Sequence, residues 1–86
     1  MNRSTSEMQN NISLDRLKIG DTVKIQTIDS LEIPAKFFEL GFYPGSLIEI
    51  KHKAPFGGPI CVNIIENNSL IAIRKSEAKL ITVEKI

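Results

Sequence analysis

The chain has few of the residues that bind metals or form disulfides. Its 86 residues include one cysteine, Cys61, one histidine, His52, and no tryptophan. A single cysteine excludes an internal disulfide, and with one histidine it cannot make a closely spaced set of zinc ligands. We therefore expect a protein of a reducing compartment that holds no metal and no cofactor.

Long apolar runs are also missing. The longest uninterrupted apolar stretch has four residues, whereas a membrane-spanning helix needs about 20. The first residues carry no apolar core after Arg3, so they do not resemble a secretion signal. A formal charge of +1 creates no long-range field that would attract nucleic acid or an anionic membrane. These features predict a cytoplasmic protein with no direct membrane insertion and no nucleic-acid partner.

What is present fits one small domain with a tail. A chain of 86 residues buries roughly 60–65% of its unfolded surface, which is enough to fold alone. Residues 1–11 are polar and show no apolar periodicity, which predicts a disordered N-terminal tail. Residues 12–86 then form the single domain.

Alternation of apolar and polar residues predicts a mainly β fold with one inserted helix. Strands are expected at 22–28, 46–54, 60–65, 70–73 and 81–86. Between the first two, Pro34 suits the first turn of a helix and Gly41 the residue after its end, with Ile33, Phe37 and Leu40 as the apolar stripe of that helix. Three turns are also expected: a short helical turn that lays Leu14 and Leu17 over a core edge, a type II turn at Pro44-Gly45, and a last turn before 81–86 with Ser76 as its cap. Short strands in sequential order favour a small antiparallel sheet curled into a barrel, which hides its edges.

The sequence "APFGGP" at 54–59 separates two of these strands and predicts a hairpin tip. If the inward-facing residues of 46–54 and 60–65 share one core face, paired residue numbers must have an even sum. That register requires an odd loop, of three or five residues within 55–59. A phosphate-binding loop is excluded, because a strand follows instead of a helix and there is no Gly-Lys-Ser.

The same register bears on the one possible metal pair. An even sum places His52 and Cys61 on opposite faces of the sheet, so they could not share an ion unless a bulge turned one of them over. Catalysis has no better candidate. Asp15, Asp21 and Asp29 lie near turns, where aspartate ordinarily accepts backbone hydrogen bonds. We expect no catalytic residues and no enzymatic activity.

Phe56, at the apex of the predicted hairpin, is the most informative aromatic residue. A phenylalanine in this position either folds back over the barrel or forms an anchor for a partner protein. Nucleic-acid binding is the alternative function, and it would use Lys51, Lys53, Arg74 and Lys75. Because Lys51 and Lys53 share their face with Glu49, a solvated charged surface is the better interpretation.

Four motifs in order resemble the family of ferrous iron transport protein A (FeoA). They are "LDRLKIGD", "FFELGFYPGS", "APFGGPI" and "LIAIRKSEAKLITV", and the resemblance runs from about Leu14 to Val83. It implies an SH3-like small barrel and a cytosolic accessory of a membrane ferrous iron permease that bears a GTPase domain. It brings no catalytic residues. Phe37-Phe38 departs from the aliphatic residues usual there.

The resemblance and the hairpin together predict a protein-interaction module that docks on the cytosolic, GTPase-bearing part of the permease. The expected contact residues are Phe56, Gly57, Gly58 and Lys53, with Phe42 and Tyr43 second. The alternative is a small nucleic-acid-binding barrel or a metal-regulator-type domain, since metal-dependent repressors carry the same barrel. Against the latter, no DNA-binding helices precede the barrel in this sequence.

Overall fold

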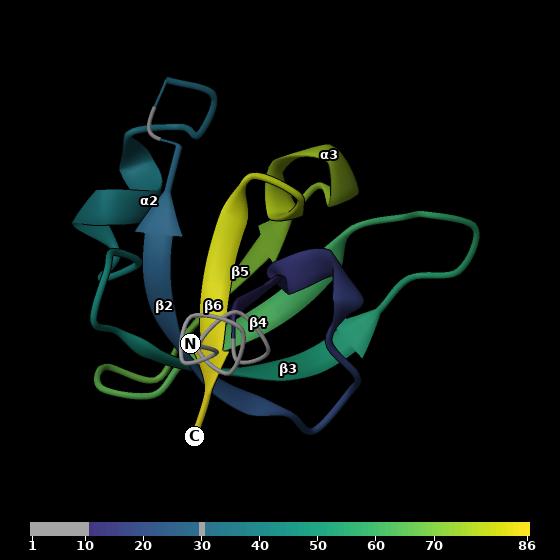
Figure 1. The fold of residues 1–86 in the computed structure, drawn as a ribbon, viewed down its shortest axis with the longest axis horizontal. Coiled ribbons are helices and arrows are strands. Elements are labelled where there is room, and N and C mark those ends of the chain that lie inside the picture. Colours follow the sequence, from purple (N-terminus) through teal and green to yellow (C-terminus); the bar gives the residue numbers. More distant parts are fainter. Residues whose placement is uncertain (1–10, 30) are drawn as a thin grey trace, which may run out of the picture.

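The fold is one antiparallel sheet, strongly curled, with short helical turns between its strands (Figure 1). This computed structural model describes residues 11–29 and 31–86. The elements are β1 (Asn11–Ser13), η1 (Leu14–Arg16), β2 (Thr22–Ile28), α2 (Lys36–Glu39), β3 (Leu47–Lys53), β4 (Ile60–Ile64), β5 (Ser69–Ile73), α3 (Lys75–Ala78) and β6 (Ile81–Lys85). The six strands lie in the order β1-β6-β2-β3-β4-β5, so β1 and β5 form the two edges. The predicted mainly β, antiparallel fold is confirmed.

Along each strand, every second side chain faces inward, and these inward-facing side chains form the core. In β4 the buried residues are Ile60, Val62 and Ile64, while the residues between them are only half-buried. The same alternation places Ile48 and Ile50 of β3 in the core. Since both strands contribute aliphatic residues at a period of two, they share one apolar face, as the alternation predicted.

The turns follow their sequence signals. Leu14 and Leu17 are buried, so the short turn after β1 covers the core as expected. Pro44-Gly45 forms the expected type II turn: the Ser46 N–H donates to the Tyr43 carbonyl at 3.0 Å, and Gly45 has φ +99°. No helix in the described part of the chain is long and apolar enough to cross a membrane.

Several element predictions were incomplete. β1 was not predicted, and Asn11, which the predicted tail included, lies in it; residues 1–10 of that tail fall outside the described residues. The inserted helix is only one turn, and Leu40 at its end is 39% exposed instead of facing the core. The last turn begins at Lys75, where the Glu77 carboxylate accepts the Arg74 N–H at 3.0 Å. Ser76 is therefore inside that turn and not its cap.

Candidate functional site

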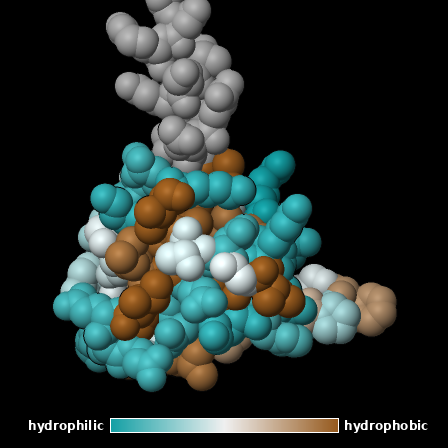
Figure 2. All heavy atoms as spheres, turned by 90° about the horizontal axis from the view of Figure 1, so that it is seen from below, coloured by the Kyte–Doolittle hydropathy of each residue, from teal (hydrophilic) through white to brown (hydrophobic). Residues whose placement is uncertain are grey.

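The β3–β4 hairpin extends beyond the rest of the sheet as a projecting loop, at the right of Figure 1 and of Figure 2. The strand pairing continues to Ala54, whose N–H donates to the Pro59 carbonyl at 3.0 Å. Inside that pair, the Gly58 N–H donates to the Pro55 carbonyl at 3.2 Å. The loop therefore has four residues, 55–58, and the predicted odd loop is wrong.

Phe56 and Gly57 occupy the central positions of this turn in left-handed conformations. Their φ angles are +58° and +74°, which is the pattern of a type I′ turn. Glycine adopts it without strain, but for another L-residue the left-handed region costs about 1–2 kcal/mol. The Phe56 side chain is fully exposed (102%). It does not fold back over the barrel, which was one of the two possibilities left open by the sequence.

The tip has two close neighbours. A Cβ on Gly58 would lie 2.7 Å from the Ala54 Cβ, so a side chain does not fit there. A Cβ on Gly57 would lie 3.9 Å from the Lys75 Cδ, an ordinary contact distance. Lys75 on α3 therefore lies beside the tip, although it was not among the predicted contact residues. The two are far apart in the chain, and only the fold brings them together.

Lys53 was predicted as a contact residue, but its ammonium group is used inside the molecule. It donates to the Leu17 carbonyl at 2.7 Å and to the Asp15 carbonyl at 3.1 Å. These bonds attach the η1 turn to the base of the hairpin. Lys53 thus stabilises the fold at the base of the hairpin and does not extend toward a partner.

Phe42 and Tyr43, the second pair of predicted contacts, lie elsewhere. Phe42 is fully buried (0%) and its ring meets the Phe37 ring edge-on, with centroids 5.7 Å apart and planes at 74°. Burial in the core removes Phe42 from any accessible surface. Tyr43 is 43% exposed, but it precedes β3 whereas the tip follows it, so the two lie at opposite ends of that strand (Figure 1).

The register near the tip also differs from the prediction. Ile48 pairs with Ile64 and Ile50 with Val62, which is the expected even sum, but His52 pairs with Cys61 because the register shifts between Ile50 and His52. The expectation that His52 and Cys61 lie on opposite faces is therefore wrong. His52 is exposed and Cys61 half-buried. Within residues 11–29 and 31–86, no group of three or more His, Cys, Asp or Glu side chains is placed to hold a metal.

The basic residues proposed for nucleic-acid binding do not act as one set. Lys51 lies 3.8 Å from the Glu49 carboxylate, and Lys53 is engaged by backbone carbonyls. Only Arg74 and Lys75, at the start of α3, remain as an exposed adjacent pair. This division does not favour a phosphate-binding surface.

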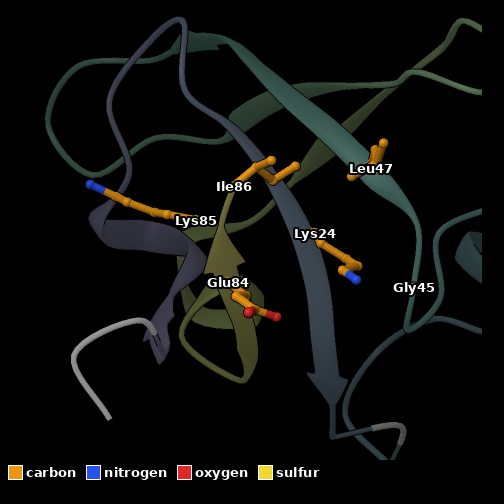
Figure 3. Close-up of a pocket in the computed structure, with 6 residues that line it drawn as sticks. All are labelled: Lys24, Gly45, Leu47, Glu84, Lys85 and Ile86. Carbon is orange, nitrogen blue, oxygen red and sulfur yellow. The ribbon is translucent and has the colours of Figure 1, made fainter. Parts of the chain in front are cut away.

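A hollow of about 420 Å³ lies at the outer side of the sheet, where β2, β3 and the end of the chain meet (Figure 3). Lys24 is paired with Leu47 on one side and Glu84 on the other, and Ile86 borders the hollow above them. The lining brings together aliphatic groups and surface charges, without a nucleophile next to a base.

Two of the three aspartates considered for catalysis, Asp21 and Asp29, have structural partners, whereas the buried Oδ1 of Asp15 has none among the described residues. Asp21 accepts the Lys18 N–H at 2.8 Å, and Asp29 accepts the Leu31 N–H at 3.3 Å. Both are turn contacts of the kind predicted from their positions.

Comparison with known proteins identifies relatives. The family model of the FeoA domain matches residues 12–85. A FeoA-like protein from Clostridium acetobutylicum is 33% identical with a TM-score of 0.74, covering 90% of this chain and 88% of its own. FeoA from Stenotrophomonas maltophilia, an SH3 domain protein solved with zinc, is 25% identical with a TM-score of 0.66, covering 85% and 89%.

A more distant structure shares only the fold. A manganese-dependent transcriptional repressor superposes with a TM-score of 0.73 at 21% identity, and the match covers 88% of this chain but 42% of the repressor. A search among curated proteins finds no significant match. The family match, which spans nearly all described residues, therefore outweighs the alternative of a metal-regulator-type domain.

Proposed function

The chain belongs to the FeoA domain family, which is linked to ferrous iron transport, and from this premise we propose how it takes part. It is a non-enzymatic cytoplasmic accessory that docks on the cytosolic, GTPase-bearing part of a membrane iron permease. The docking surface is the hairpin tip, made of Phe56, Gly57 and Gly58, with Lys75 beside it. The resemblance to the family suggests the partner, and the hairpin suggests the surface.

The conformation and exposure of Phe56 are the observation that carries this proposal. A large apolar ring stands fully in water at the apex of a projecting loop, on a backbone with φ +58°. Both features are unfavourable in the free protein, and strained, exposed residues of this kind are frequent at binding sites. Burying a phenylalanine in a partner's pocket would contribute about 1.5–3 kcal/mol. Aromatic anchors dominate many interfaces in this way.

The small size of the tip limits the affinity. A four-residue loop with one aromatic anchor covers much less than the roughly 800 Å² per partner of a standard interface. We therefore expect a dissociation constant in the range of about 1 to 100 micromolar, because the cost of association takes up most of the gain from so small an area.

Binding of the permease's purified soluble domain tests the proposal, with wild type compared against Phe56→Ala by isothermal calorimetry. The matched control is Leu31→Ala, since Leu31 is also an exposed apolar loop residue (92%) but lies outside the tip. We expect Phe56→Ala to weaken binding at least tenfold and Leu31→Ala to leave it unchanged, with all three proteins folded by NMR. Equal binding by Phe56→Ala would remove the tip from the proposal, and no binding by wild type would remove the partner.

A further inference from the structure

The free edge of the sheet at β5 has hydrogen-bonding groups that face away from its neighbour. The Ile65 N–H donates to the Leu47 carbonyl at 3.0 Å, so the odd-numbered positions of β4 turn their backbone toward β3. Its even-numbered positions therefore turn toward β5, where they meet Ser69, Ile71 and Ile73. It follows that the N–H and C=O groups of Leu70 and Ala72 point to the open side of the sheet.

A groove borders this edge. Two hollows of about 300 and 200 Å³ share Lys36, Phe37 and Ala72, so they join into one depression between β5 and the α2 segment. We call it the edge groove; its lining is Pro34, Lys36, Phe37, Leu40, Leu70, Ile71, Ala72, Arg74 and Glu77. One wall is thus an unpaired strand edge and the other is a helical turn.

The two ends of the edge groove differ chemically. At one end, Leu40 and Leu70 are 39% and 63% exposed, which gives an apolar surface. At the other end lies the exposed Arg74, and the exposed Lys36 lies between the two ends, where the hollows join. The nearby Glu77 carboxylate already accepts the Arg74 N–H at 3.0 Å. Lys36 and Arg74 are two cations against the single Glu77 carboxylate, so this part of the groove has a net positive charge.

We propose that the edge groove binds an extended peptide segment of a partner protein as an additional strand beside β5. The peptide carries apolar side chains at the Leu70 end and acidic side chains at the Arg74 end. Main-chain bonds to Leu70 and Ala72 hold it, as in other cases of strand addition, and the side-chain contacts select it. The groove shares no residue with the hairpin tip or with Lys75 beside it, so the inference does not depend on docking to a permease.

A second copy of the chain fits this groove less well than a single peptide strand. The β5 strand of another copy, Ser69–Ile73, carries no acidic side chain and is followed by Arg74 and Lys75. It therefore offers nothing to pair with the cationic Lys36 and Arg74 of the groove. A peptide strand with acidic side chains does complement them.

NMR titration of the full chain with synthetic peptides tests the inference. The probe is the capped heptapeptide Thr-Val-Thr-Val-Glu-Val-Glu, compared with a basic version that has Lys for Glu. A third version of the acidic peptide is N-methylated at alternate residues, which removes main-chain donors but keeps the side chains. We expect the acidic peptide to shift amides of residues 70–74 and 36–40, and to slow exchange at Leu70 and Ala72 several-fold. Both other versions should bind at least tenfold more weakly.

Charge reversal provides the matched variants. Arg74→Glu should reverse the preference to the basic peptide, while Arg16→Glu, an exposed arginine on η1, should leave it unchanged. No shifts at millimolar acidic peptide, shifts outside the groove, or equal binding of acidic and basic versions would overturn the inference. Concentration-dependent shifts of residues 70–72 without peptide would also overturn it, because they would identify a second copy as the occupant.

Discussion

His52 on β3 and Cys61 on β4 are direct partners across the hairpin, because β3 contains one extra residue between Ile50 and His52. Cys61 alternates with the buried Ile60 and Val62, so it lies on the outer side of the sheet. Its partner His52 shares that side. An imidazole and a thiol thus stand next to each other on the surface, close to the base of the projecting loop.

This pair should not bind zinc or ferrous iron at stoichiometric amounts. Stable zinc sites in proteins use three or four protein ligands, and the described residues supply no third ligand to these two. We expect that one equivalent of either metal leaves the His52 ring and Cys61 Cβ signals unshifted in NMR spectra. Cys61→Ser is the control for metal bound elsewhere. A shift of both signals that saturates at one equivalent in wild type, and is lost in Cys61→Ser, would contradict this.

The bulge shows where alternation in a sequence stops being informative. Up to Ile50, aliphatic residues mark the phase of β3, and the predicted even register is correct there. Beyond Ile50 the sequence is Lys-His-Lys, which has no apolar residue to report which face each position takes. An inserted residue is therefore invisible in this stretch. The loop length and the placement of His52 both depended on it, and both were wrong for this one reason.

The positions of the turns could be predicted from the sequence, but the burial of their side chains could not. The signals for Pro44-Gly45 and for the hairpin tip were local, and they predicted the right places. Which of the adjacent aromatics Phe42 and Tyr43 enters the core could not be predicted, because a turn has no period that assigns its residues to a face. The edge groove was missed for a related reason. It joins residues from α2 and β5 that only the curvature of the sheet brings together.

Replacing Phe56 by asparagine should stabilise the free protein. Asparagine is among the residues most tolerant of positive φ, whereas Phe56 holds φ +58° while its ring makes no burial gain. We expect Phe56→Asn to raise the free energy of unfolding by about 0.5–1 kcal/mol, measured by urea denaturation. Phe56→Ala, which keeps the unfavourable conformation without the ring, should remain within about 0.5 kcal/mol of wild type. Equal stability of the two variants would show that the backbone at this position is not strained.

The side chain of Lys53 should contribute measurably to the stability of the protein, whereas that of Lys51 should contribute little. Lys53→Met keeps the aliphatic part of the side chain but leaves the carbonyls of Asp15 and Leu17 without their donor. The expected loss is about 1–3 kcal/mol, with faster amide hydrogen exchange in η1. Lys51→Met removes only a surface ion pair of 3.8 Å and should change stability by less than about 1 kcal/mol. Similar losses for the two variants would mean that the Lys53 bonds do not hold η1 in place.

Substitutions at Phe42 and Tyr43 should affect stability differently, because the first residue is buried in the core and the second is half-exposed. The edge-on contact between Phe37 and Phe42, with centroids 5.7 Å apart, is a geometry worth about 0.5–1.5 kcal/mol beyond the buried area. Phe42→Leu should lower the free energy of unfolding by about 1–3 kcal/mol, and a double-mutant cycle with Phe37→Leu should recover a coupling in the range above. Tyr43→Leu, on the half-exposed neighbour, should cost less than about 0.5 kcal/mol. If Phe42→Leu left stability unchanged but weakened binding of the permease domain, Phe42 would belong to the docking surface after all, and its burial in the free chain would have to be relieved when the partner binds.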